Sequence, residues 1–157
     1  MDNNKNQQKL QHLSDFALSF ANKHHCSEQE LRASLSYLIP HDKVNQVFAY
    51  MIASNVIDDA NTIMQVIHQQ LEHQQGREHI ELSLKKRKFN DRLIHQSLDR
   101  LNVDWYQVCK QAKHKQFGER KPEGQKEKLE VIRYLRAKGH QIKDIMVCIE
   151  EHDDIAC

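Results

Sequence analysis

Apolar residues recur every three or four positions through most of the sequence, which is the spacing of one face of an α-helix. Leu31, Leu35 and Leu38 form one such stripe, and Pro40 is expected to bound its helix because proline removes a backbone donor. The tight turns of an all-β fold need glycine, and the 157 residues include only 4 Gly and 2 Pro. The sequence therefore predicts an all-α fold.

Polar residues and glycines mark the expected helix ends. Ser27 is expected to begin a helix by accepting the amide of Glu30. Three further caps are expected just before later stripes, at Asp58-Asp59, Asn90 and Asp104. Three glycines are expected to end helices: Gly76, Gly118 and Gly139. Gly76 is expected to adopt the left-handed conformation.

The stripes repeat with a period near fifty residues. Leu35, Leu84 and Leu135 lie 49 and 51 residues apart, and segment 84–89 aligns without a gap with segment 135–140. The first cycle matches only with two extra residues, so coincidental helical periodicity remains the alternative. We predict three tandem three-helix units in an elongated, curved helical array. Their expected bounds are 1–57 with an N-terminal extension, 58–102 and 103–152, followed by an acidic tail at 153–157.

The net charge of +1 conceals an uneven distribution. Residues 1–76 carry a net −3, residues 77–140 a net +8, and residues 141–157 a net −4. A basic middle between acidic ends is typical of proteins that meet a polyanion or an acidic groove, although charged runs also occur on ordinary solvated helices. We predict that ten basic residues form a partner-binding or phosphate-binding surface: Lys85, Lys86, Arg87, Lys88, Arg92, Lys113, Lys115, Arg120, Lys121 and Arg136.

Other kinds of site are not expected. No apolar run is long enough to span a membrane and the first residues are polar, so we expect a cytoplasmic protein. The histidines and cysteines lack metal-ligand spacing, and neither a phosphate-binding glycine loop nor a nucleophile motif is found. Cys109 and Cys148 are interpreted as buried, reduced thiols. We therefore expect a non-enzyme with no cofactor, no metal and no small-molecule substrate.

Two other functions remain open from the residues. A stand-alone DNA-binding module of helix-turn-helix type would use the helix at residues 91–101, where Arg92, His95, Gln96 and Arg100 face outward. A helical adaptor that binds only proteins would use the acidic tail or the grooves between units. Binding to bare duplex DNA with a preferred sequence would favour the first, and salt-insensitive binding to a protein would favour the second.

Several motifs, in order, resemble the RecX family of bacterial RecA regulators over about residues 16–149. The first unit has Ser27-Glu28-Gln29-Glu30-Leu31 with Leu35, and the second has Ile57-Asp58-Asp59, then Gly76 with Ile80 and Leu84. The third has Asp104-Trp105, Phe117-Gly118, and then Lys128, Leu135, Arg136 and Gly139. The sequence departs from the family pattern around Asn55 and Ala60, and at Lys88, where the family commonly has glycine.

The resemblance implies a protein that lies in the helical groove of a RecA filament on single-stranded DNA. Such a protein would limit filament growth and reduce ATP hydrolysis and strand exchange in DNA repair and the SOS response. The implied partners are the RecA filament and the phosphates of its single-stranded DNA. The basic residues of the predicted surface would supply the electrostatic attraction.

Overall fold

The computed structural model describes residues 2–54 and 56–151, which form nine α-helices and no strand. The prediction of an all-α fold is confirmed, and 78% of the described residues are helical. Within the described ranges, no helix is long and apolar enough to cross a membrane. The helices are α1 (Asp2–His24), α2 (Glu28–Ser36), α3 (His41–Ala53), α4 (Asp59–Glu72), α5 (Arg77–Lys86), α6 (Asp91–Leu101), α7 (Trp105–Phe117), α8 (Gly124–Ala137) and α9 (Ile142–Glu150).

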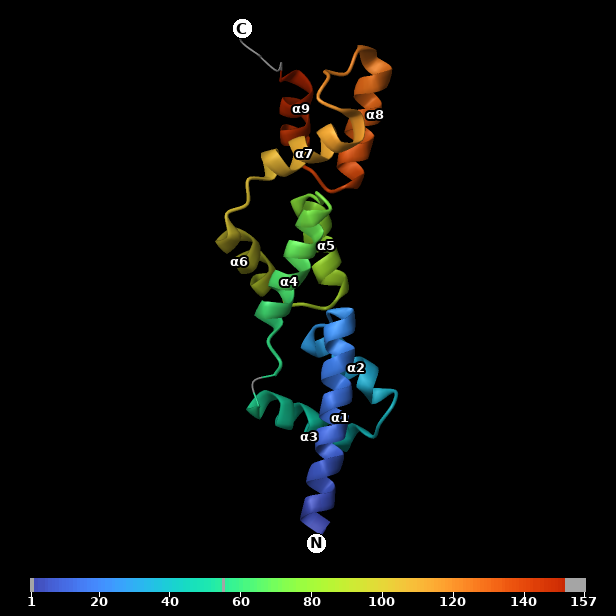
Figure 1. Ribbon diagram of the computed structural model, residues 1–157, viewed down its shortest axis with the longest axis vertical. Coiled ribbons are helices and arrows are strands. Elements are labelled where there is room, and N and C mark those ends of the chain that lie inside the picture. Colours follow the sequence, from blue (N-terminus) through green and yellow to red (C-terminus); the bar gives the residue numbers. More distant parts are fainter. Residues whose placement is uncertain (1, 55, 152–157) are drawn as a thin grey trace.

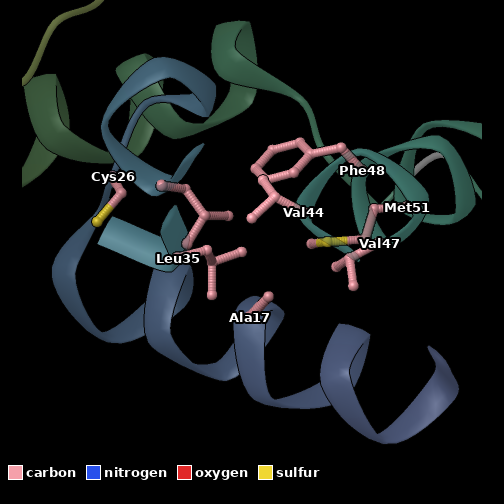
Figure 2. Packing of buried hydrophobic residues seen from close by; sticks show 8 residues of the cluster. Ala17, Cys26, Leu35, Val44, Val47, Phe48 and Met51 are labelled. Carbon is pink, nitrogen blue, oxygen red and sulfur yellow. The ribbon is translucent and has the colours of Figure 1, made fainter. Parts of the chain in front are cut away.

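The first three helices share one hydrophobic core, and we call them the first bundle. Ala17 of α1, Leu35 of α2, and Val44, Phe48 and Met51 of α3 belong to one cluster of buried side chains, as Figure 2 shows. All five side chains are at most 3% exposed. Their burial is the main force that holds the three helices together, since removing apolar area from water contributes roughly 25 cal/mol per Å².

Two further cores follow along the chain. The second bundle, α4–α6, buries a cluster that includes Ile63, Ile80 and Leu98, and the third bundle, α7–α9, buries one that includes Leu135 and Ile145. Figure 1 shows the three bundles one after another along the longest axis of the molecule, with the N-terminal half of α1 projecting at one end. This arrangement is compatible with three tandem three-helix units. We propose that the units divide near residues 57 and 102; the predicted tail at 153–157 lies outside the described residues.

The predicted helix caps at four helix starts are confirmed. The Ser27 side chain accepts the backbone N–H of Glu30 at 3.0 Å. The other three caps accept the amide three positions along at 3.2 Å each, and they are Asp58, Asn90 and Asp104. Each cap satisfies an amide that the helix itself leaves without a partner, so these starts are fixed by local chemistry.

The prediction for Gly76 is wrong, whereas Gly118 and Gly139 end helices with φ of 79° and 89°. The left-handed residue after α4 is Gln74, with φ of 53°. Gly76 has φ of −79° and is the N-cap of α5. Its glycine is needed for space, because a Cβ there would lie 2.3 Å from the carbonyl carbon of Gly139.

Gly76 and Gly139 meet at the contact between the second and third bundles, which we call the second joint (residues 73–79 with residues 136–140). The amide of Gly76 donates to the carbonyl of Lys138 at 2.7 Å, and the amide of Glu78 donates to the carbonyl of Gly139 at 3.2 Å. The last carbonyls of α8 therefore cap the first amides of α5. The contact joins the negative end of one helix dipole to the positive end of another.

The first joint, between the first and second bundles, is built differently. Here the hydroxyl of Ser27 donates to the carbonyl of Arg87 at the end of α5, and the amide of Glu28 donates to a carboxylate oxygen of Asp59 at 3.0 Å. As at the second joint, the end of one helix meets the start of another: here the end of α5 meets the start of α2, whose first residue is Glu28. Two side chains take the place of the direct backbone contacts of the second joint.

We expect Gly139→Ala to destabilise the protein by roughly 2–4 kcal/mol. The added Cβ would lie 2.4 Å from the backbone nitrogen of His79 and would also occupy a left-handed conformation. Gly124→Ala is the matched control, because Gly124 has φ of 70° but no atom within 4 Å of a new Cβ. The control should cost only about 1 kcal/mol. Urea unfolding measures both, and equal losses would contradict the close contact at the second joint.

The second joint should also weaken at acidic pH. His140 is 2% exposed and its Nε2 lies 2.9 Å from the carbonyl of Gln74. Burial lowers the pKa of His140, and the charge of Lys138 lowers it further, while the Gln74 carbonyl and Asp144 act in the opposite direction. Near pH 6.5, His140 therefore binds a proton in the unfolded chain but not in the folded chain. The free energy of unfolding falls as the pH falls below that value.

We expect His140→Gln to reduce this pH dependence, because glutamine can donate to the same carbonyl without titrating. Urea unfolding at about pH 7.5 and about pH 5.5 compares the two proteins. The exposed His68 supplies the control variant, His68→Gln, which should behave as the wild type. An unchanged pH dependence in His140→Gln would assign the effect to other groups.

Candidate functional site

Four residues of the predicted surface lie exposed around the end of α5 and the start of α6, and we call them the first basic cluster: Lys85, Lys86, Lys88 and Arg92. Among the described residues, none of the four lies within 4.0 Å of a carboxylate. Lys85 and Lys86 belong to the last turn of α5, where the helix dipole favours cations. Their charges are thus available to an external anion.

Arg87 stands between this cluster and the first joint. It is half-buried, its backbone carbonyl accepts the hydroxyl of Ser27, and its guanidinium Nη1 lies 3.5 Å from the carbonyl of His25. Sequence reasoning placed Arg87 on the binding surface but did not foresee its role in the joint. In the described part of the chain no carboxylate lies within 4.0 Å of the Arg87 guanidinium, so a neutral carbonyl leaves its charge uncompensated.

The prediction that Lys113 lies on the surface is wrong. Lys113 is 2% exposed, and its Nζ donates to the carbonyl of Arg120 at 2.7 Å. It follows buried Cys109 by four positions in α7, so the helical period carries it inward with the apolar residues. Its aliphatic stem is buried and its ammonium ties down the loop that leads to α8.

That loop carries two more predicted residues, Arg120 and Lys121, both exposed. Arg120 is paired within the protein, at 3.2 Å to Glu123 and 3.4 Å to Glu127. The backbone amide of Glu123 and the charge of Arg120 lower the pKa of Glu127. Arg120 therefore offers less uncompensated charge to a partner than Lys121 does.

The last two predicted residues, Lys115 and Arg136, lie at the second joint. Arg136 donates to Glu78 at 3.0 Å and to the carbonyl of His140 at 2.8 Å. The ammonium of Lys115 lies 3.5 Å from the side-chain oxygen of Gln74. Both side chains thus bridge the second and third bundles.

Sequence reasoning missed one cation there, Lys138. It is half-buried and donates to the carbonyl of His73 across the second joint at 2.7 Å. The repeat offered a signal, because Lys138 lies 51 residues after Arg87, in the segment that aligns without a gap. Both cations reach a backbone carbonyl of the preceding bundle.

The structure distributes the candidate site over three places: the first basic cluster, the second joint and the loop before α8 (Figure 1). This arrangement suits anionic groups presented at intervals by an extended partner more than one compact ligand. In the described ranges, no group of three or more metal-ligating side chains is assembled. Cys109 and Cys148 are both buried, and their contact raises the pKa of the Cys109 thiol.

Comparisons with known proteins point to one group. The chain is 29% identical over 96 residues to the "Regulatory protein RecX" of Serratia proteamaculans (strain 568), and 28% identical over 96 residues to that of Yersinia enterocolitica. It is 24% identical over 130 residues to that of Salmonella paratyphi A (strain ATCC 9150 / SARB42), a match that covers 76% of this chain. The chain is therefore similar to several proteins named Regulatory protein RecX.

The extent of the matches differs among these RecX relatives. The two 96-residue matches cover 61% of this chain, and the chain spans 57% of the Serratia protein and 58% of the Yersinia protein. It spans 78% of the Salmonella protein. No protein-family model matches the chain. These relatives are named as regulatory proteins, in agreement with the resemblance drawn from the motifs.

Lys88 occupies a position where the RecX family commonly has glycine, and the backbone strain there can be measured as a free energy of unfolding. It has φ of 64°, so a lysine adopts the left-handed conformation that glycine takes at Gly139. We expect Lys88→Gly to stabilise the protein by about 0.5–1 kcal/mol, because the strain of the Cβ is removed. Lys85→Gly removes the same charge from inside α5 and should instead cost about 1 kcal/mol. Urea unfolding of both variants tests the assignment, and a loss of stability in Lys88→Gly would refute it.

Proposed function

We propose that the protein is a RecX-type regulator that binds the RecA filament on single-stranded DNA. The observation that carries this proposal is the similarity to regulatory proteins named RecX along as much as 76% of the chain. On this proposal the protein mainly inhibits ATP hydrolysis, filament growth and strand exchange. It is not an enzyme, and it acts in the cytoplasm, in DNA repair and the SOS response.

The shape and charge of the molecule support this proposal. Three bundles in line present a long flank, and a helical filament offers a long groove (Figure 1). The first basic cluster carries exposed cations that face no carboxylate within the described residues. Acidic protein surface or DNA phosphate in the groove would supply the opposite charge.

Titration of the protein into RecA that is hydrolysing ATP on single-stranded DNA tests the proposal. We expect the hydrolysis rate to fall steeply at fewer than one copy per RecA subunit. We expect the triple variant Lys85→Glu, Lys86→Glu and Lys88→Glu to need at least about tenfold more protein for the same inhibition, since three attractions become repulsions. Arg87 is left unchanged because it belongs to the first joint.

The matched control reverses three exposed lysines of the first bundle: Lys5, Lys23 and Lys43. It changes the net charge by the same amount and should inhibit RecA as the wild type does. Equal weakening in both triple variants would remove the first basic cluster from the mechanism. No effect of the wild-type protein on RecA would refute the proposed function, and sequence-specific binding to bare duplex DNA would then favour a helix-turn-helix module.

A further inference from the structure

The turn at the end of α4 receives three side chains from the third bundle. Lys138 donates to the carbonyl of His73 at 2.7 Å, and His140 lies 2.9 Å from the carbonyl of Gln74. Lys115 donates to the side-chain oxygen of Gln74 at 3.5 Å. Two ammonium groups, from the last turn of α7 and the end of α8, therefore lie over consecutive residues of one turn.

Neither charge is paired with an opposite charge among the described residues. In the part of the chain that the structure describes, neither Lys115 nor Lys138 lies within 4.0 Å of a carboxylate. Glu78, at the same joint, is paired with Arg136 at 3.0 Å. Burial lowers the pKa of Lys138, and repulsion from Lys115 lowers it further.

The pair is also held in place. Lys138 is half-buried, with its ammonium 5.6 Å from the centre of the Tyr134 ring and hydrogen-bonded to His73. Lys115 is exposed, so the site is open to solvent on one side. The third bundle supplies both ammonium groups, from α7 and the end of α8, and the turn after α4 supplies their acceptors, so the second joint fixes the position of the pair. An oxyanion that contacts both ammonium groups would relieve their repulsion and connect α7 to α8 at the joint.

We propose that Lys115 and Lys138 form a binding site for a phosphate group at the second joint. A phosphate has several acceptor oxygens, so two separate ammonium groups can donate to it at once. Lysines bind phosphate as point charges and need no planar, bidentate geometry. The phosphate comes either from a free polyphosphate or from the backbone of a single nucleic-acid strand, and the two sources share this chemistry.

Isothermal titration calorimetry on the full chain tests the site with two probes, inorganic tripolyphosphate and an oligothymidylate, at matched ionic strength. We expect Lys115→Gln and Lys138→Gln each to lower the affinity by about threefold to tenfold. The double variant should lose little more than either single variant, because both lysines hold the same phosphate. Lys23→Gln with Lys43→Gln, two exposed lysines of the first bundle, is the control and should bind as the wild type.

Lys138→Gln also affects the stability of the protein, so a second measurement is needed that does not depend on stability. The pKa of Lys138, followed by NMR, should rise in Lys115→Gln and should rise in the wild type when a phosphate probe binds. Loss of tripolyphosphate binding in the variants identifies a free polyphosphate as a ligand, and loss of oligothymidylate binding alone identifies a strand backbone. Either result supports the site.

Three results would overturn the proposal. The first is an affinity for both probes that Lys115→Gln leaves unchanged. The second is a loss of affinity in the control variant equal to that in the lysine-pair variants. The third is polyglutamate binding that depends on the pair as strongly as phosphate binding does. The last result would make the site one for carboxylates. No RecA is present in these experiments, so their failure would leave the proposed function untouched.

Discussion

The stack of bundles depends on a direct contact between helix ends at the second joint. The carbonyls of Lys138 and Gly139 cap the amides of Gly76 and Glu78, so the end of α8 continues into the start of α5. Helix ends carry backbone groups without partners, and burying them against one another satisfies both sets at once. The contact is possible because neither glycine has a Cβ, which would lie 2.3–2.4 Å from the opposite backbone.

The first joint meets the same need with side chains. Ser27 accepts an amide of its own helix and donates to the carbonyl of Arg87, while Asp59 accepts the amide of Glu28. Lys88 takes the left-handed conformation that belongs to Gly139 at the second joint. The two consecutive contacts between bundles thus use different chemistry, as is expected if the predicted repeats have diverged in sequence.

Charge and architecture are linked at both joints. Arg87 and Lys138, one repeat apart, each reach back to a carbonyl of the preceding bundle, and other cations lie beside each of them. A partner that binds through these cations would therefore also contact the residues that orient one bundle relative to the next. In the proposed function, binding of the filament to these cations would therefore also affect how the bundles are oriented relative to one another.

The sequence by itself determined the all-α fold, four helix caps and most of the buried faces, although Leu38 of the first stripe lies beyond the end of α2 and is 64% exposed. Caps such as Asp58 and Asn90 act on an amide three residues away, and apolar stripes follow the helical period, so both are legible in short stretches. The RecX motifs were legible for the same reason, because each lies within one unit. These features need no knowledge of distant parts of the chain.

Only the tertiary structure decided what happens where bundles meet. The space constraint on Gly76 comes from Gly139, 63 residues away, and the position of Lys138 depends on a turn of another bundle. The burial of Lys113 had a local signal, which is its spacing from Cys109. A buried ammonium also needs a hydrogen-bond acceptor, however, and a carbonyl in the following loop supplies it. A charge count records how many cations a segment holds, whereas their contacts depend on packing between elements that are far apart in sequence.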